Sequence, residues 1–176
     1  MAAFTVIDHT ELGASASSWS KTSIPSSYDH LLLKVSARTD TAAHLGNLML
    51  RFNSDTGTNY SQTLLYANAS TPSSARGTGL TSIYWGTNVG GASILADTFG
   101  AIKIWIPNYA NTANFKQAVL NGVVENNSTT AAQSNLHMAA GLWSSTAAIN
   151  AVSLTDLAGG NLVQYSTFTL YGVTGA

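Results

Sequence analysis

The chain shows no helical periodicity over any long window, and this constrains its fold more than any other feature. Apolar residues recur at every second position, in short runs separated by clusters of Gly, Ser, Thr and Asn. Such alternation puts one row of side chains on each face of an extended strand, so that one face can be buried. The pattern predicts an all-β protein of about ten short antiparallel strands.

The clearest strand covers residues 29–39, where Leu31, Leu33, Val35 and Ala37 share one face and Leu32 joins the polar residues on the other. We expect the run at 4–9 to be an edge strand or a joining strand. The remaining strands are expected at 46–53, 60–67, 80–85, 101–106, 115–124, 136–143, 148–154 and 165–173.

The segment 53–59, NSDTGTN, is expected to form a tight turn, because Asn, Asp and Gly tolerate turn conformations. It would join the strands at 46–53 and 60–67 as a hairpin. Segments 68–79 and 125–135 are expected to be long loops. Short strands without helices between them predict a two-sheet β-sandwich of jelly-roll type, in a single domain spanning residues 1–176.

The composition is unusually poor in charge. Only 9% of the 176 residues are charged and the formal net charge is −1, whereas about 25% is typical of soluble domains. The chain therefore lacks the basic footprint of a nucleic-acid-binding protein. It also lacks a run of about 18 apolar residues, so we expect no membrane-spanning helix. With 45% hydrophobic residues, a folded core is expected, not disorder.

Candidate metal ligands are few, because the chain has no Cys and its four His residues are scattered. Asn53, Asp55 and Asn59 surround Gly57 in the expected turn and partly match a loop that presents oxygen atoms to Ca²⁺. The further carboxylates and the final Glu of an EF-hand loop are missing. The pattern favours a plain turn, with Ca²⁺ as the only cofactor left open.

Catalytic motifs are missing from the sequence. No GxSxG, GxGxxG or GxxxxGK[ST] pattern occurs. Glu11 and Glu125 are the only glutamates, and the six aspartates are spread along the chain, which gives no paired carboxylates for glycoside hydrolysis. We therefore expect a protein that is not an enzyme.

Two further groups of residues are candidates for a role. Tyr84, Trp85 and Trp105 could form an exposed aromatic surface that binds glycan or protein, although core packing is the simpler interpretation of most aromatic residues. Arg38 with Asp40, and Arg51 with Asp55, are close enough in sequence to form ion pairs of architectural value.

Four segments resemble a recurrent pattern in virion structural proteins of tailed bacteriophages, notably phages of aquatic bacteria. They are IPSSYDHLLLKVSARTD (24–40), LRFNSDTGTNYS (50–61), IKIWIPNYANT (102–112) and STFTLYGV (166–173). The resemblance implies a β-sandwich that serves as a capsid decoration module, a tail-fibre tip or a baseplate domain. It also implies symmetric homo-oligomers, most commonly trimers, located in a virion assembled in the host bacterial cytoplasm.

These observations lead to a hypothesis with one rival. The chain is expected to be a non-enzymatic virion protein on the particle exterior that decorates or cements the capsid. Its partners would be copies of itself and other virion proteins, such as the major capsid protein or tail components, and the loop at 71–79 is where contacts specific to a partner are expected. The rival is a tail-fibre or receptor-binding module whose residues Tyr84, Trp85 and Trp105 stack on host glycan.

Overall fold

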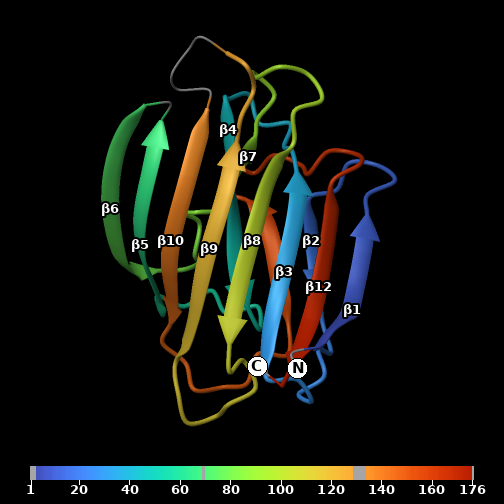
Figure 1. Ribbon diagram of the computed structural model, residues 1–176, viewed down its shortest axis with the longest axis vertical. Helices are drawn as coiled ribbons and strands as arrows, with labels where there is room; N and C mark the ends of the chain where they lie inside the picture. The colour runs from blue at the N-terminus through green and yellow to red at the C-terminus, as the bar shows by residue number, and fades with distance from the viewer. Residues whose placement is uncertain (1–2, 69, 129–133, 176) are drawn as a thin grey trace.

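The computed structural model describes residues 3–68, 70–128 and 134–175. It contains twelve antiparallel strands in two sheets (Figure 1), and none of the described residues lies in a helix. The all-β, two-sheet sandwich is thus confirmed, with two strands more than the ten or so predicted. The split into eight and four strands is consistent with a jelly-roll-like sandwich whose sheets differ in size.

The larger sheet has eight strands and the smaller has four. In the larger sheet the spatial order is β1 (Ala3–Glu11), β12 (Thr167–Thr174), β3 (His30–Ala37), β8 (Gly100–Pro107), β9 (Lys116–Val124), β10 (Asn135–Trp143), β5 (Tyr60–Asn68) and β6 (Thr71–Leu80). In the smaller sheet, which lies behind the larger one in Figure 1, the order is β2 (Ser18–Lys21), β11 (Val152–Asp156), β4 (Leu45–Phe52) and β7 (Asn88–Gly90).

The core lies between the sheets and is built from the alternating rows of apolar side chains. On β3 the predicted row of Leu31, Leu33, Val35 and Ala37 is buried, and β4 contributes its own buried row. Burial of such rows removes apolar surface from water, which is the main favourable contribution to folding. The rings of Trp19 on β2 and Phe168 on β12 stack across the two sheets with centroids 5.1 Å apart.

The predicted hairpin at 53–59 is wrong. Its two strands, β4 and β5, lie in different sheets, so the turn carries the chain from one sheet to the other. The reason is an anchor outside the turn: the Asn53 side chain donates a hydrogen bond to the Ala148 carbonyl and accepts one each from the Asn150 and Ala151 amides. These bonds hold the end of β4 beside the segment that leads into β11.

Two segments exchange roles relative to the prediction. Residues 71–79, expected in a loop, belong to the edge strand β6, and residues 81–85, expected in a strand, form an irregular segment. β6 shows little apolar alternation because it pairs with β5 alone and is largely exposed. The short strands β2 and β7 were also missed, since three or four residues are too few to show a period.

The irregular segment at 81–87 nevertheless has fixed partners. Ile83 exchanges two backbone hydrogen bonds with Leu50 of β4, at 2.7 and 3.0 Å. The side-chain oxygen of Gln62 on β5 accepts the amides of Tyr84 and Trp85. Gly86 has a φ of +82°, and a Cβ there would lie 2.7 Å from the Cβ of Ala139, so glycine allows the chain to turn in contact with β10.

Candidate functional site: the outer face of the larger sheet

One face of the eight-stranded sheet packs on the smaller sheet, and the opposite side, here called the outer face, carries exposed apolar side chains. Leu65 on β5, Val119 and Val123 on β9, and Leu136 and Met138 on β10 are each between 40% and 62% exposed. The strand register places Leu136 beside Val123, and Met138 beside Leu65. Soluble monomers rarely expose large contiguous apolar patches, and such patches commonly mark interaction sites.

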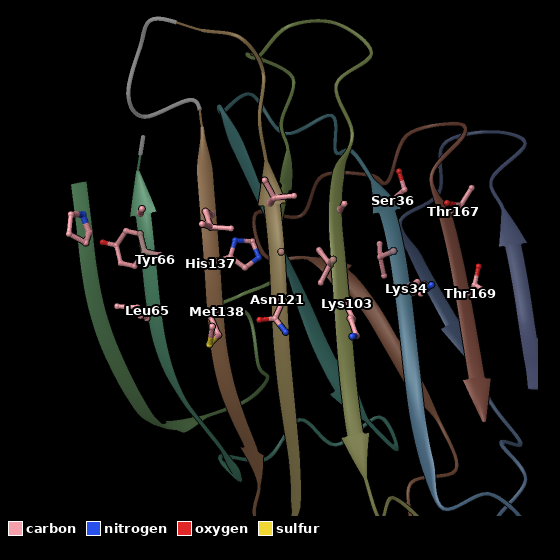
Figure 2. Close-up of a pocket in the computed structure, with 18 residues that line it drawn as sticks. Lys34, Ser36, Leu65, Tyr66, Lys103, Asn121, His137, Met138, Thr167 and Thr169 are labelled. Carbon is pink, nitrogen blue, oxygen red and sulfur yellow. The ribbon is translucent and has the colours of Figure 1, made fainter. Parts of the chain in front are cut away.

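The outer face is hollowed into an open groove of about 720 Å³ (Figure 2). Its two halves differ in chemistry. Leu65, Leu136 and Met138 on β5 and β10 line the apolar half, and Lys34 on β3 and Lys103 on β8 lie side by side in the other half. The apolar half of the groove can therefore bind an apolar surface, while the lysines of the other half remain in contact with solvent.

The lysines of the groove are exposed and lie on interior strands of the sheet. The Lys34 ammonium is 5.7 Å from the centre of the Tyr171 ring, a cation–π contact. The only ion pair within the described ranges joins Lys21 and Asp8 at 3.2 Å, away from this groove. Neither groove lysine is thus neutralised by an acidic neighbour among those residues.

A lysine on an exposed strand can protect a sheet edge from pairing with a neighbouring molecule, but Lys103 and Lys116 do not have this role. The edge strands of the larger sheet are β1 and β6, whereas Lys103 and Lys116 lie on the interior strands β8 and β9. Lys116 is also buried, and its ammonium donates hydrogen bonds to the carbonyls of Asn114 and Thr146, at 2.7 and 3.2 Å. Desolvation by this burial lowers the pKa of Lys116.

The candidate calcium ligands hold the turn together by hydrogen bonds. The Asp55 carboxylate accepts bonds from the Gly57 amide, the Asn59 side chain and the Trp143 indole N–H, which together lower its pKa. Asn53 bonds to the segment 148–151 as described above. The turn therefore uses these oxygens to fix its own shape, and no group of three or more His, Asp or Glu gathers within the described ranges.

Neither expected arginine–aspartate pair forms. The Arg38 guanidinium donates to the carbonyls of Leu95 and Thr98 at 2.8 and 3.1 Å, while Asp40 accepts the backbone and side-chain N–H groups of Asn161. Arg51 donates to the Thr81 carbonyl at 3.0 Å instead of to Asp55. Both arginines connect segments far apart in sequence. The Arg38 guanidinium binds more than one carbonyl because it has five N–H donors.

The three candidate aromatic residues do not form one surface. Trp105 lies on the outer side of β8, with its ring centre 4.9 Å from that of His30. Trp85 packs against the core on the inner side of the larger sheet, with Tyr84 at a centroid distance of 5.8 Å. The separation arises because the backbone of the segment 81–87 pairs with β4 of the smaller sheet, whereas Trp105 lies on β8 of the larger sheet.

Sequence reasoning missed the apolar residues of the outer face, although a signal for them was present. In the strands that became β5, β9 and β10, apolar residues occur on both faces, as in the pairs Leu64–Leu65, Val119–Leu120 and Val123–Val124. In a strand with one solvent-exposed face, apolar residues should alternate with polar residues. Two apolar faces therefore predict a second apolar surface on these strands, besides the one that packs on the smaller sheet.

No known protein-family model, curated protein or solved structure matches this chain or its fold. In the part of the chain that the structure describes, there is no helix long and apolar enough to cross a membrane.

Proposed function

We propose that the chain is a non-enzymatic structural protein of a phage virion, exposed on the particle exterior, and that its outer face is the surface through which it assembles. The observation that carries the proposal is the exposed apolar half of the groove on β5, β9 and β10. The protein would decorate or cement the capsid as a homo-oligomer, as the resemblance of its sequence segments to phage virion proteins implies.

The chemistry of the groove favours a protein partner. Its apolar half is lined by the aliphatic side chains of Leu65, Leu136 and Met138, and the central parts of protein interfaces are apolar in the same way. Sugar-binding surfaces instead present aromatic faces with polar groups at their rims. The low charge of the chain also supports assembly, since few ions must be desolvated when copies pack together.

The test is the molar mass of the purified protein, measured by light scattering over a range of concentrations. The wild-type chain should be oligomeric, and the double variant Leu136→Lys, Met138→Lys should be monomeric, because two buried cations would have no partners in the interface. Both side chains are more than half exposed in the single chain, so the variant should keep its thermal midpoint. Leu95→Lys, at a residue 62% exposed outside the groove, is the matched control.

A monomeric wild type, or a double variant with the wild-type mass, would contradict assembly through this face. Antibody labelling of intact particles tests the location. An even signal over heads agrees with decoration, whereas a signal confined to tails would favour the rival receptor-binding module.

A further inference from the structure

A second cavity, of about 320 Å³, lies on the inner side of β5 and β6. These strands lie beyond the edge of the smaller sheet in Figure 1. Trp85, in the irregular segment 81–87, lies against them there: its amide bonds to Gln62 of β5 and its ring is next to Gly77 of β6. The lining of the cavity includes Asn47, Asn68, Asn88 and Asn135 and the aromatic residues Tyr66 and Trp85, together with three aliphatic residues. We call it the amide cavity.

The four asparagines form two hydrogen-bonded pairs. The side-chain NH₂ group of Asn88 donates to the side-chain oxygen of Asn47 at 2.8 Å. The side-chain NH₂ group of Asn135 donates to the side-chain oxygen of Asn68, also at 2.8 Å. A primary amide has two donor hydrogens and an acceptor oxygen. Each pair therefore keeps side-chain groups that can bind a ligand. They include the side-chain oxygen of Asn88 as an acceptor and the side-chain NH₂ groups of Asn47 and Asn68 as donors.

The Trp85 indole lines the same cavity and can contact a ligand there. Its N–H makes no hydrogen bond within the described ranges, whereas the indole N–H groups of Trp19 and Trp143 donate to Thr10 and Asp55. The rim of its six-membered ring lies near Gly77 of β6, where a Cβ would be 3.4 Å away. An aromatic ring beside polar groups suits a ligand with an apolar face and a hydroxylated rim.

The cavity carries no formal charge. None of its lining residues is ionisable near neutral pH. The Nδ1–H of the neighbouring His137 donates a hydrogen bond at 2.8 Å to the side-chain oxygen of Asn135. Burial lowers the pKa of His137 to about 4, so that it is neutral at pH 7. An ionic ligand would lose its hydration here without gaining a counter-charge.

We propose that the amide cavity binds an uncharged pyranose sugar, with one sugar face on Trp85 and its hydroxyls on the asparagine side chains. Sugar hydroxyls both donate and accept hydrogen bonds, as the amides do. The volume is at the lower end of the ~300–1,000 Å³ range of small-molecule sites, which suits a ligand of one or two rings. The site is on the opposite side of the sheet from the outer face, so it does not depend on the proposed assembly.

The test uses the indole N–H signals in ¹H–¹⁵N spectra of the full chain during titration with glucose, galactose, mannose and N-acetylglucosamine. The Trp85 signal, assigned by its loss in Trp85→Phe, should shift saturably with at least one sugar. The Trp105 and Trp143 signals should not move. Asn88→Ala should weaken binding about fivefold or more, and Asn121→Ala, on the outer face, should leave it unchanged.

Three results would overturn the proposal. The first is the lack of a saturable Trp85 shift with all four neutral sugars at high millimolar concentration. The second is a shift that Asn88→Ala leaves at wild-type affinity while its spectrum shows an intact fold. The third is tighter binding of glucuronic acid or sialic acid than of any neutral sugar, because the uncharged lining should disfavour anions.

Discussion

At the scale of single residues, the few charged side chains near the core bind backbone carbonyls and not each other. Lys116 bonds two carbonyls, Arg51 bonds the Thr81 carbonyl, and Arg38 bonds those of Leu95 and Thr98. These bonds satisfy backbone carbonyls that lie outside the strand ladders. Each charge thus secures an irregular segment to a strand.

His137 should make the stability of the protein sensitive to mild acid. It is 2% exposed, and burial lowers its pKa from 6.5 to about 4. Between these values the unfolded chain binds a proton that the folded chain does not, so the free energy of unfolding should fall as the pH decreases through this window and be fully retained above it. The total loss should be about 3 kcal/mol, since each pKa unit corresponds to ~1.4 kcal/mol.

The measurement is urea unfolding of wild type and His137→Gln at several pH values between 7 and 4. The variant should lose most of this pH dependence, whatever its stability at pH 7. His9→Gln, at an exposed histidine on β1, is the control. Its free energy of unfolding should change with pH by the same slope as that of the wild type. Equal slopes for wild type and His137→Gln would show that another group causes the acid response.

At the scale of elements, the strands depend on irregular segments that side chains hold in place. The segment 91–99 joins β7 to β8, and the Arg38 guanidinium binds four of its carbonyls, two of them at 3.4 Å. The amides of Ala92 and Ser93 bond to the carbonyls of Thr41 and Ala43. One side chain thereby fixes the connection between the two sheets.

Replacing Arg38 should loosen this connection locally. In Arg38→Met, hydrogen exchange at the amides of Ala92 and Ser93 should be at least about tenfold faster, because a charge-assisted bond contributes ~1.5–3 kcal/mol. Exchange in the centre of β3 and β9 should change much less. Arg76→Met, at an exposed arginine on the edge strand β6, is the matched control. Unchanged exchange at Ala92 would show that the carbonyl bonds do not hold the segment.

At the scale of the whole molecule, the fold is held by apolar burial and backbone pairing with little help from ion pairs. The single ion pair of the described ranges, between Lys21 and Asp8, is partly exposed, and such pairs contribute about 0–1 kcal/mol. The core rows of the two sheets, together with the stacked rings of Trp19 and Phe168, provide the contact between layers.

Salt should therefore have little effect on stability. Between low and physiological NaCl concentrations, the thermal midpoint should change by less than about 2 °C, because screening acts on a pair that contributes at most ~1 kcal/mol. The measurement is thermal unfolding followed by near-ultraviolet circular dichroism, with Lys21→Met as the variant that removes the pair. A large decrease with salt in wild type, lost in Lys21→Met, would show that the pair matters more than its exposure suggests.

The sequence alone determined the fold class and most of the strands. Side chains at positions i and i+2 of a strand face the same side, so alternation is a local property that can be read without knowing the partners. The row on β3 was predicted residue by residue, and it is buried. The same local logic located the turn at 53–59, although not the sheets that it connects.

Only the tertiary structure decided which strands pair and which apolar faces are covered. β4 and β5 are neighbours in sequence but lie in different sheets, and β6 is a strand because β5 pairs with it and not because of its own residues. The groove on the outer face and the amide cavity each combine residues from strands far apart in the chain. Long-range pairing sets these neighbours, and no local period in the sequence records it.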